Sequence, residues 1–242
     1  MIPLRDDNPT TLKPIVTIGI VAVCTLVFLW QATLPPADQD RLVHGLGLVP
    51  AILFGRAELP PGLVLVPAEL SLFTSMFLHA GWLHLIGNML YLWIFGNNVE
   101  DALGHVRFVG FYLACGLAAA LAQAWQAPDS TIPMVGASGA IGGVLGAYLV
   151  LFPRARVLVL LPLGLFTQVI RVPAIVVLGF WFVLQFLGGF VAGVEGAGAE
   201  EGGIAYWAHI GGFAAGAVLV APLRRRGIGL LKGITRPRGP WG

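Results

Sequence analysis

Six long apolar runs constrain the fold of this chain more than any other feature of its sequence. Only 11% of the 242 residues are charged, against about 25% in a typical soluble domain. A helix needs about 20 mostly apolar residues to cross a ~30 Å hydrocarbon core, and backbone polar groups in lipid must bond within their own segment. We therefore predict an all-α integral membrane protein with six transmembrane helices. The predicted spans cover approximately residues 14–33, 81–97, 105–125, 136–152, 173–193 and 204–222.

The sequence contains no internal repeat and no low-complexity tract, which predicts a single membrane domain over residues 1–242 with short tails at both ends. The first apolar run follows Arg5 and Lys13, as a signal peptide would follow its basic residues. It exceeds the usual apolar core of about 7–15 residues, and no clear cleavage site follows it, so we expect an uncleaved span. Cys24 and Cys115 lie inside apolar runs and are expected to be buried rather than paired.

The basic residues predict the orientation in the membrane. The chain has 14 Lys and Arg residues. If the N-terminus is cytoplasmic, 12 of them lie in cytoplasmic segments and two, Arg41 and Arg56, lie in outer segments. Such a bias is typical of cytoplasmic segments, so both termini are predicted to be cytoplasmic. A compact chain without a targeting presequence favours a bacterial plasma membrane. The net charge of +2 is too small to indicate a nucleic-acid partner.

Three segments between the spans are unusual. The first outer loop, about 34–80, is semi-apolar and rich in proline, so we expect it to fold against the outer leaflet. The last outer loop, about 194–203, is short and glycine-rich, as a mobile cap would be. The apolar stretch 154–172 has Arg near both ends, and a seventh span there would place the cluster 224–226 outside. We therefore expect a hairpin or re-entrant segment at the inner face.

Polar residues recur near the starts of three predicted spans. Such residues are costly in a membrane and indicate function. In the predicted topology these spans run in the same direction, and at 1.5 Å per residue their polar residues lie at a similar depth of roughly 3–9 Å. One site assembled from three helices would require this coincidence. The candidates are His79, His84 and Asn88 around the second span, Gly136 and Ser138 at the fourth, and His209 in the sixth.

Small residues share the helical faces of the candidate serine and histidine. Gly142 and Gly146 follow Ser138 by four and eight residues, and Gly212 and Gly216 follow His209 by three and seven. Small residues at such spacing let helix backbones approach closely. We therefore expect the fourth and sixth spans to pack tightly and to bring the hydroxyl and the imidazole within hydrogen-bond reach.

This combination of residues is suited to nucleophilic catalysis. A serine hydroxyl needs a base to take its proton, and an imidazole can do so near neutral pH. No Asp or Glu lies inside a span at this depth, so we predict a Ser138–His209 dyad without a carboxylate. The backbone N–H of Ser138 and the side chains of His84 and Asn88 are candidate oxyanion donors. Gly136 leaves room for a substrate backbone beside the nucleophile.

Each of these residue types also occurs in membrane spans without catalytic chemistry. Taken singly, an intramembrane serine often bonds its own helix, an intramembrane histidine often joins two helices, and G-x-S-x-G also marks the nucleophile elbow of soluble hydrolases. His79, His84 and His209 could be ligands of an intramembrane metalloprotease, but the sequence has no H-E-x-x-H motif and no intramembrane carboxylate. A small transporter would not explain the placement of the serine and the histidine, and no inverted repeat is visible.

Three motifs follow one another along the chain: HAGWLHLIGNM at 79–89, GASGAIG at 136–142 and AHIGG at 208–212, accompanied by Asn98-Val99-Glu100 and by the six-span pattern. In this order they strongly resemble the rhomboid protease family. The likeness covers about residues 70–220. It implies a rhomboid-like bundle in which Ser138 is the nucleophile, His209 the base, and His84 with Asn88 the oxyanion-side residues. His79 matches a further family histidine with a supporting role.

The resemblance also implies a substrate class. Members of the family cut transmembrane proteins near their outer ends, so single-span membrane proteins are the expected partners, within the lipid bilayer and without a metal or cofactor. A relative that binds membrane clients without cutting them should lack the serine or the histidine, and this chain has both. The first loop of many members carries a Trp-Arg pair that is missing here, so the resemblance leaves the detailed shape of this loop open.

Substrate access requires an element that opens sideways. The fifth span carries the bulky stretch Phe180–Phe186, with few small residues, and leads into the glycine-rich segment 194–203. We expect it to pack more loosely than the fourth and sixth spans and to act as a lateral gate, although these aromatic side chains could also simply face lipid.

Overall fold

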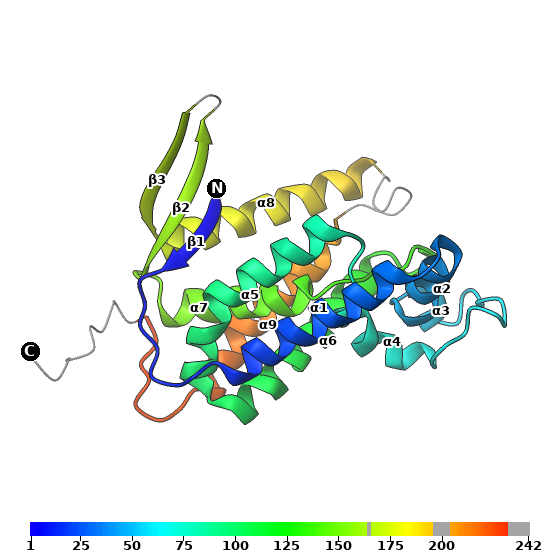
Figure 1. Ribbon diagram of the computed structural model, residues 1–242, viewed down its shortest axis with the longest axis horizontal. Coiled ribbons are helices and arrows are strands. Elements are labelled where there is room, and N and C mark those ends of the chain that lie inside the picture. Colours follow the sequence, from blue (N-terminus) through cyan, green and yellow to red (C-terminus); the bar gives the residue numbers. More distant parts are fainter. Residues whose placement is uncertain (164–165, 196–203, 232–242) are drawn as a thin grey trace, which may run out of the picture.

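Each of the six apolar runs forms a helix whose ends lie within a few residues of the prediction, except for the longer C-terminal end of the second. The computed structural model describes residues 1–163, 166–195 and 204–231. In Figure 1 these helices lie side by side along the long axis of the molecule. They are α1 (Ile15–Thr33), α5 (Trp82–Leu103), α6 (His105–Gln126), α7 (Ser138–Leu151), α8 (Ala174–Glu195) and α9 (Tyr206–Leu223).

By length and apolar composition, four of the described helices can each cross a membrane. These are α1, α6, α9 and the part of α8 that ends at Ala192. A fifth crossing results if Ala68–Phe77 and α5, which meet at a bend of 80°, are counted as one span. The remaining apolar helix, α7, has only 14 residues. The chain is therefore an integral membrane protein, and the count of six spans stays a prediction.

A small antiparallel sheet accompanies the helices. Its strands are β1 (Ile2–Asp6), β2 (Arg156–Leu163) and β3 (Phe166–Pro173), in the order β1-β2-β3. The stretch 154–172 thus forms most of a β-hairpin, one of the two alternatives expected there, and not a further helix. The chain is mostly helical as predicted, but the all-α prediction omitted this sheet. Val157 and Val159 of β2 are fully buried and join the core of the bundle, which fixes the sheet to one end of it.

The predicted first outer loop, about 34–80, is folded and lies at the end opposite to the sheet (Figure 1). It contains α2 (Pro36–Leu46), α3 (Pro50–Leu53), α4 (Ala68–Thr74) and the 3-10 helix η1 (Ser75–Phe77). A bridge between Leu48 and Met134 joins it to the loop that precedes α7. The predicted glycine-rich cap at 194–203 lies, beyond its first two residues, outside the described part of the chain.

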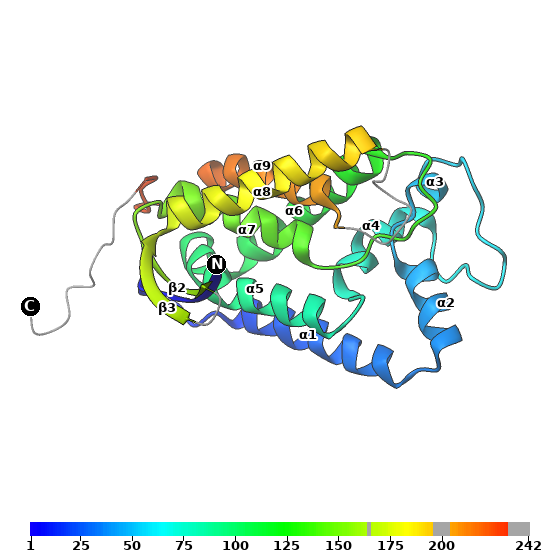
Figure 2. The ribbon, with the colours of Figure 1, turned by 90° about the horizontal axis from the view of Figure 1, so that it is seen from above.

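The short helix α7 forms the centre of the bundle, with α5 and α8 on either side of it (Figure 2). Its residues from Gly139 to Tyr148 are all buried. The predicted close packing of α7 against α9 is confirmed: a Cβ atom on Gly212 would overlap the carbonyl oxygen of Gly139, and one on Gly216 would overlap that of Gly143. The N-terminal half of α7 is therefore held backbone to backbone against α9.

A buried carboxylate anchors α1 at the end that carries the sheet. Glu100 is fully buried near the C-terminus of α5. Its oxygens accept hydrogen bonds from the backbone N–H of Val16 (2.9 Å) and from the backbone N–H and hydroxyl of Thr17 (2.8 and 2.7 Å), and lie 2.6 Å from Nδ1 of His105. The carboxylate thereby satisfies backbone donors in the first turn of α1 that have no acceptor within the helix.

Candidate active site

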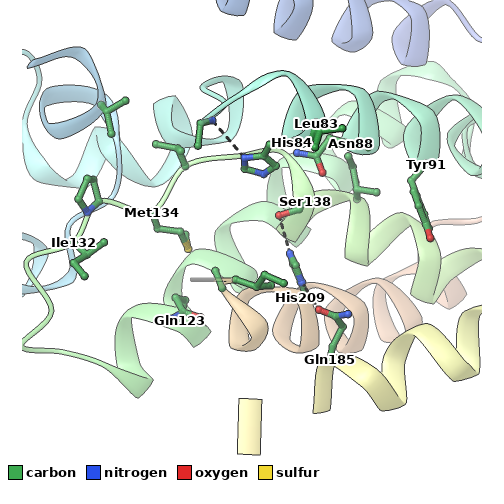
Figure 3. A pocket seen from close by; sticks show the side chains of 18 of the residues that line it. Leu83, His84, Asn88, Tyr91, Gln123, Ile132, Met134, Ser138, Gln185 and His209 are labelled. Atoms are coloured by element: carbon green, nitrogen blue, oxygen red, sulfur yellow. Dashed lines mark hydrogen bonds between the residues drawn. The ribbon is translucent and has the colours of Figure 1, made fainter. Parts of the chain in front are cut away.

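A cavity of about 840 Å³ opens between α5, α7, α8 and α9. Four of the residues singled out in the sequence line it: His84, Asn88, Ser138 and His209. Figure 3 shows His84 and Asn88 on one side of Ser138, and His209 on the other. The structure thus brings together side chains that are up to 125 residues apart in the chain.

Ser138 and His209 are hydrogen-bonded to each other. The Ser138 Oγ lies 2.8 Å from Nε2 of His209, within the range for a nucleophile and its base. Ser138 is the first residue of α7 and His209 lies in the first turn of α9, so the backbone contact between these helices fixes both side chains. The chain reaches Ser138 through Gly136, whose φ of +125° favours glycine.

His84 and Asn88 lie one turn apart on α5 and face the cavity. Asn88 is 8% exposed, and its Nδ2 has no hydrogen-bond partner in the described structure. Nδ1 of His84 accepts a long hydrogen bond of 3.4 Å from the backbone N–H of Ala80, which leaves the proton on Nε2. Both residues therefore offer an N–H donor to an acceptor that enters the cavity.

Gly136 and His79 lie beside this pair rather than in the cavity wall. A Cβ atom on Gly136 would be 2.7 Å from the His84 ring, so glycine is needed for this approach. His79 is fully buried, its ring centroid is 5.2 Å from that of His84, and its backbone carbonyl accepts a 3.0 Å bond from Gln31 Nε2. It packs behind His84.

One residue near the histidine had no predicted role. The Oε1 atom of Gln185, on α8, lies 2.7 Å from Nδ1 of His209. Trp181, one turn earlier, packs on the same imidazole with ring centroids 5.6 Å apart. The signal in the sequence was a lone amide within an otherwise apolar run, which the cost of polar groups in a membrane makes conspicuous.

Within the described residues, no three His, Cys, Asp or Glu side chains are grouped as metal ligands would be. The cavity wall also contains no described Asp or Glu. The polar groups that it presents are hydroxyl, imidazole and amide groups. This set can deprotonate a serine and donate hydrogen bonds to a developing oxyanion.

Comparison with known proteins places the chain in a family. A model of the Rhomboid domain matches residues 68–226. This range contains all the candidate site residues, from His79 to His209, and extends from α4 to just beyond the end of α9.

Individual relatives agree with this match. The chain is 33% identical over 151 residues to "Rhomboid protein 1, mitochondrial" of Saccharomyces cerevisiae, and 38% identical over 151 residues to "Rhomboid protease GluP" of Bacillus subtilis. It is 30% identical over 153 residues to the human "Presenilin-associated rhomboid-like protein, mitochondrial".

The aligned parts cover 61%, 62% and 62% of this chain but only 40%, 26% and 36% of these three relatives. The relatives include mitochondrial proteins as well as a bacterial one. Because the Rhomboid domain model matches more than half of this chain, the chain belongs to the rhomboid family.

Proposed function

We propose that this protein is an intramembrane serine endopeptidase that uses Ser138 as nucleophile and His209 as general base. The observation that carries this proposal is the 2.8 Å hydrogen bond between Ser138 Oγ and His209 Nε2 in the wall of a cavity. Membership of the rhomboid family and the printed name of the Bacillus subtilis relative, a rhomboid protease, support the same reaction.

The first half of the proposed reaction acylates the serine. His209 Nε2 takes the hydroxyl proton as Ser138 Oγ attacks the carbonyl carbon of the scissile peptide bond. The negative charge moves to the carbonyl oxygen, where the Ser138 backbone N–H, the His84 Nε2–H and the Asn88 Nδ2–H are the proposed donors. The Ser138 N–H is available because it lies in the first turn of α7, where no intrahelical acceptor exists. The unpaired Nδ2 of buried Asn88 supports its part in this set.

The second half releases the products. The tetrahedral intermediate collapses, the C–N bond breaks, and protonated His209 gives its proton to the leaving amine. A water molecule then loses a proton to His209 as it attacks the acyl carbon, and the returning proton restores the Ser138 hydroxyl. His209 thus acts in turn as base and acid. His79 supports His84 from behind, and Gly136 provides the space beside the nucleophile.

The proposed substrates are single-span membrane proteins, cut near the outer face of the membrane. The placement of the site supports this assignment. Ser138 and His209 lie in the first turns of α7 and α9, at the helix ends that face the first outer loop rather than the sheet (Figure 1). The charge distribution supports cytoplasmic termini, and we propose a bacterial plasma membrane as the location.

The test is cleavage of a purified single-span protein in detergent or liposomes, with labelling by a fluorophosphonate. The wild type is expected to cleave within the outer part of the substrate span, to be labelled at Ser138 and to keep its activity in a metal chelator. Cleavage that the chelator abolishes, or a wild type that neither cleaves nor is labelled, would contradict the proposal.

A further inference from the structure

A hydrogen-bonded chain of three side chains from three helices runs across the site. Ser138 of α7 bonds to Nε2 of His209 on α9 at 2.8 Å, and Nδ1 of His209 bonds to Oε1 of Gln185 on α8 at 2.7 Å. Figure 3 shows Gln185 on the side of the His209 ring that faces away from Ser138. Both ring nitrogens of His209 are therefore engaged at once.

From this geometry we infer that Gln185 is a positioning residue that fixes the tautomer of His209. Because Gln185 belongs to α8, the tautomer then depends on the position of that helix. The inference rests on the proposed function. An amide oxygen can only accept a hydrogen bond, so Nδ1 of His209 carries the proton. Nε2 then has a free lone pair, which is what accepting the Ser138 proton requires. In the opposite tautomer Nε2 would already be protonated, and the serine would have no base.

The same contact also supports the imidazolium that forms during the reaction. Once His209 has taken the serine proton, its Nδ1–H becomes a charged donor, and hydrogen bonds with a charged partner are shorter and stronger than neutral ones. Among the described residues of the cavity wall, the titratable side chains besides Ser138 and His209 are His84 and Tyr91, both on α5. Neither offers a carboxylate, so the Gln185 amide oxygen is the acceptor available at Nδ1.

The source of the contact gives it a second consequence. The backbones of α7 and α9 touch at Gly139 and Gly212, so the backbone positions of Ser138 and His209 are set without α8. Gln185 and Trp181 both belong to α8, which presents large apolar side chains on its outer face, among them Phe186 at 50% and Leu187 at 53% exposure. A displacement of α8 would remove both contacts with His209 and leave the tautomer unfixed. The reactivity of Ser138 therefore depends on α8 being packed against His209.

The test compares Gln185→Met and Gln185→Glu with the wild type. Met keeps an unbranched chain of similar length but has only a weak acceptor, and Glu keeps a strong one. The same exchange at exposed Gln168 on β3, Gln168→Met, is the matched control and should leave activity unchanged. The kinetic readouts are kcat and KM for a transmembrane substrate and for a short soluble peptide, each from pH 5 to 9.

We expect Gln185→Met to lower kcat by about 10–100-fold for both substrates with KM nearly unchanged, which is less than the ~10⁴-fold that a wrong tautomer costs in Ser-His-Asp proteases. Gln185→Glu should keep most of kcat at high pH and move the acidic limb of the pH profile to higher pH, because a carboxylate favours the imidazolium. The limb would not move if the side chain at position 185 did not contact His209.

A spectroscopic measurement is independent of cleavage. The ¹⁵N signals of His209, assigned by difference from His209→Ala, should report a protonated Nδ1 in the wild type and a mixture of tautomers in Gln185→Met. A wild type that cleaves while Gln185→Met keeps kcat, pH profile and tautomer would overturn the inference and leave the protease intact. If Gln185→Met does not fold, an unchanged acidic limb in Gln185→Glu would overturn it. A wild type without cleavage or fluorophosphonate labelling would instead contradict the proposed function.

Discussion

The carbonyl oxygen of Gly139 occupies the space that a side chain on Gly212 would need. This contact holds the first turn of α7 against α9, next to the Ser138–His209 hydrogen bond. Gly142 makes a looser contact of the same kind, since its Cβ atom would lie 3.0 Å from the backbone oxygen of His209. The geometry of the dyad therefore depends on the absence of side chains at these positions.

Gly212→Val is expected to inactivate the protein, and Gly142→Val to lower activity strongly. The added side chain would separate α7 from α9, and a displacement of about 1 Å at a reacting group can cost about 100-fold. Gly19→Val on α1 is the matched control, because a Cβ atom at Gly19 would meet nothing within 4 Å. The measurement is kcat/KM for a transmembrane substrate. Wild-type activity in Gly212→Val would contradict this role of the packing.

Asn88→Ala and His84→Ala are expected to lower kcat by about 10–1,000-fold each, with smaller effects on KM. Both side chains are proposed to bind charge that develops in the transition state, so their loss should spare substrate binding. Steady-state kinetics with a soluble peptide give the two constants separately. A variant in which KM alone changes would show that its residue binds substrate rather than the oxyanion.

Phe186→Ala is expected to speed cleavage of a transmembrane substrate and to leave a soluble peptide nearly unaffected. Phe186 is half exposed on α8, so trimming it should ease a lateral opening that forms part of the slow step. Trp181, from the same aromatic stretch, packs on His209, and Phe182 packs on Phe213, so removing Trp181 would also take away a contact of the proposed base. Trp125→Ala, at an 81% exposed position of α6, is the control.

Equal effects of Phe186→Ala on the two substrates would argue against a gate at α8. A disulfide or chemical cross-link between α5 and α8 gives a second measurement. Full activity on a transmembrane substrate in the cross-linked protein would rule the gate out.

Asp6→Asn is expected to flatten the pH dependence of stability. Burial raises the pKa of Asp6 to about 6, while the 2.5 Å hydrogen bond from the Tyr148 hydroxyl opposes this shift. The pKa of Asp6 in the folded protein lies above the unfolded value of about 3.9. The contribution of Asp6 to the free energy of unfolding is therefore fully present below about pH 4 and is lost as pH rises through about 6. Apparent Tm values of both proteins from pH 4 to 8 test this. Identical slopes would contradict it.

The sequence predicted the parts of the fold that depend on local composition. The apolar runs became helices, because a helix in lipid satisfies its own backbone. The sheet was missed because β1 pairs with β2 across about 150 residues of chain, as in the pairing of Ile2 with Leu160, and a five-residue strand carries little signal of its own. The hairpin expected as one alternative at 154–172 was easier to predict, since its two strands are neighbours.

The candidate site was predicted in the same uneven way. His84, Asn88, Ser138 and His209 could be singled out because each is polar within an apolar run and the predicted topology places them at a similar depth. The contact of Gln185 with His209 could not be predicted, because the rotation of α8 about its own axis is set by packing against α9. Periodicity alone does not specify that angle when both faces of a helix are apolar.

The most direct test of the Ser138–His209 dyad is the cleavage of a single-span substrate by the wild type, Ser138→Ala, His209→Ala and the double variant, all shown to be folded. Residues that act as one unit have non-additive effects, so each single variant should lose all but a few per cent of activity, and the double variant should be no worse than either. Cleavage well above a few per cent by Ser138→Ala or His209→Ala would contradict the assignment of the dyad.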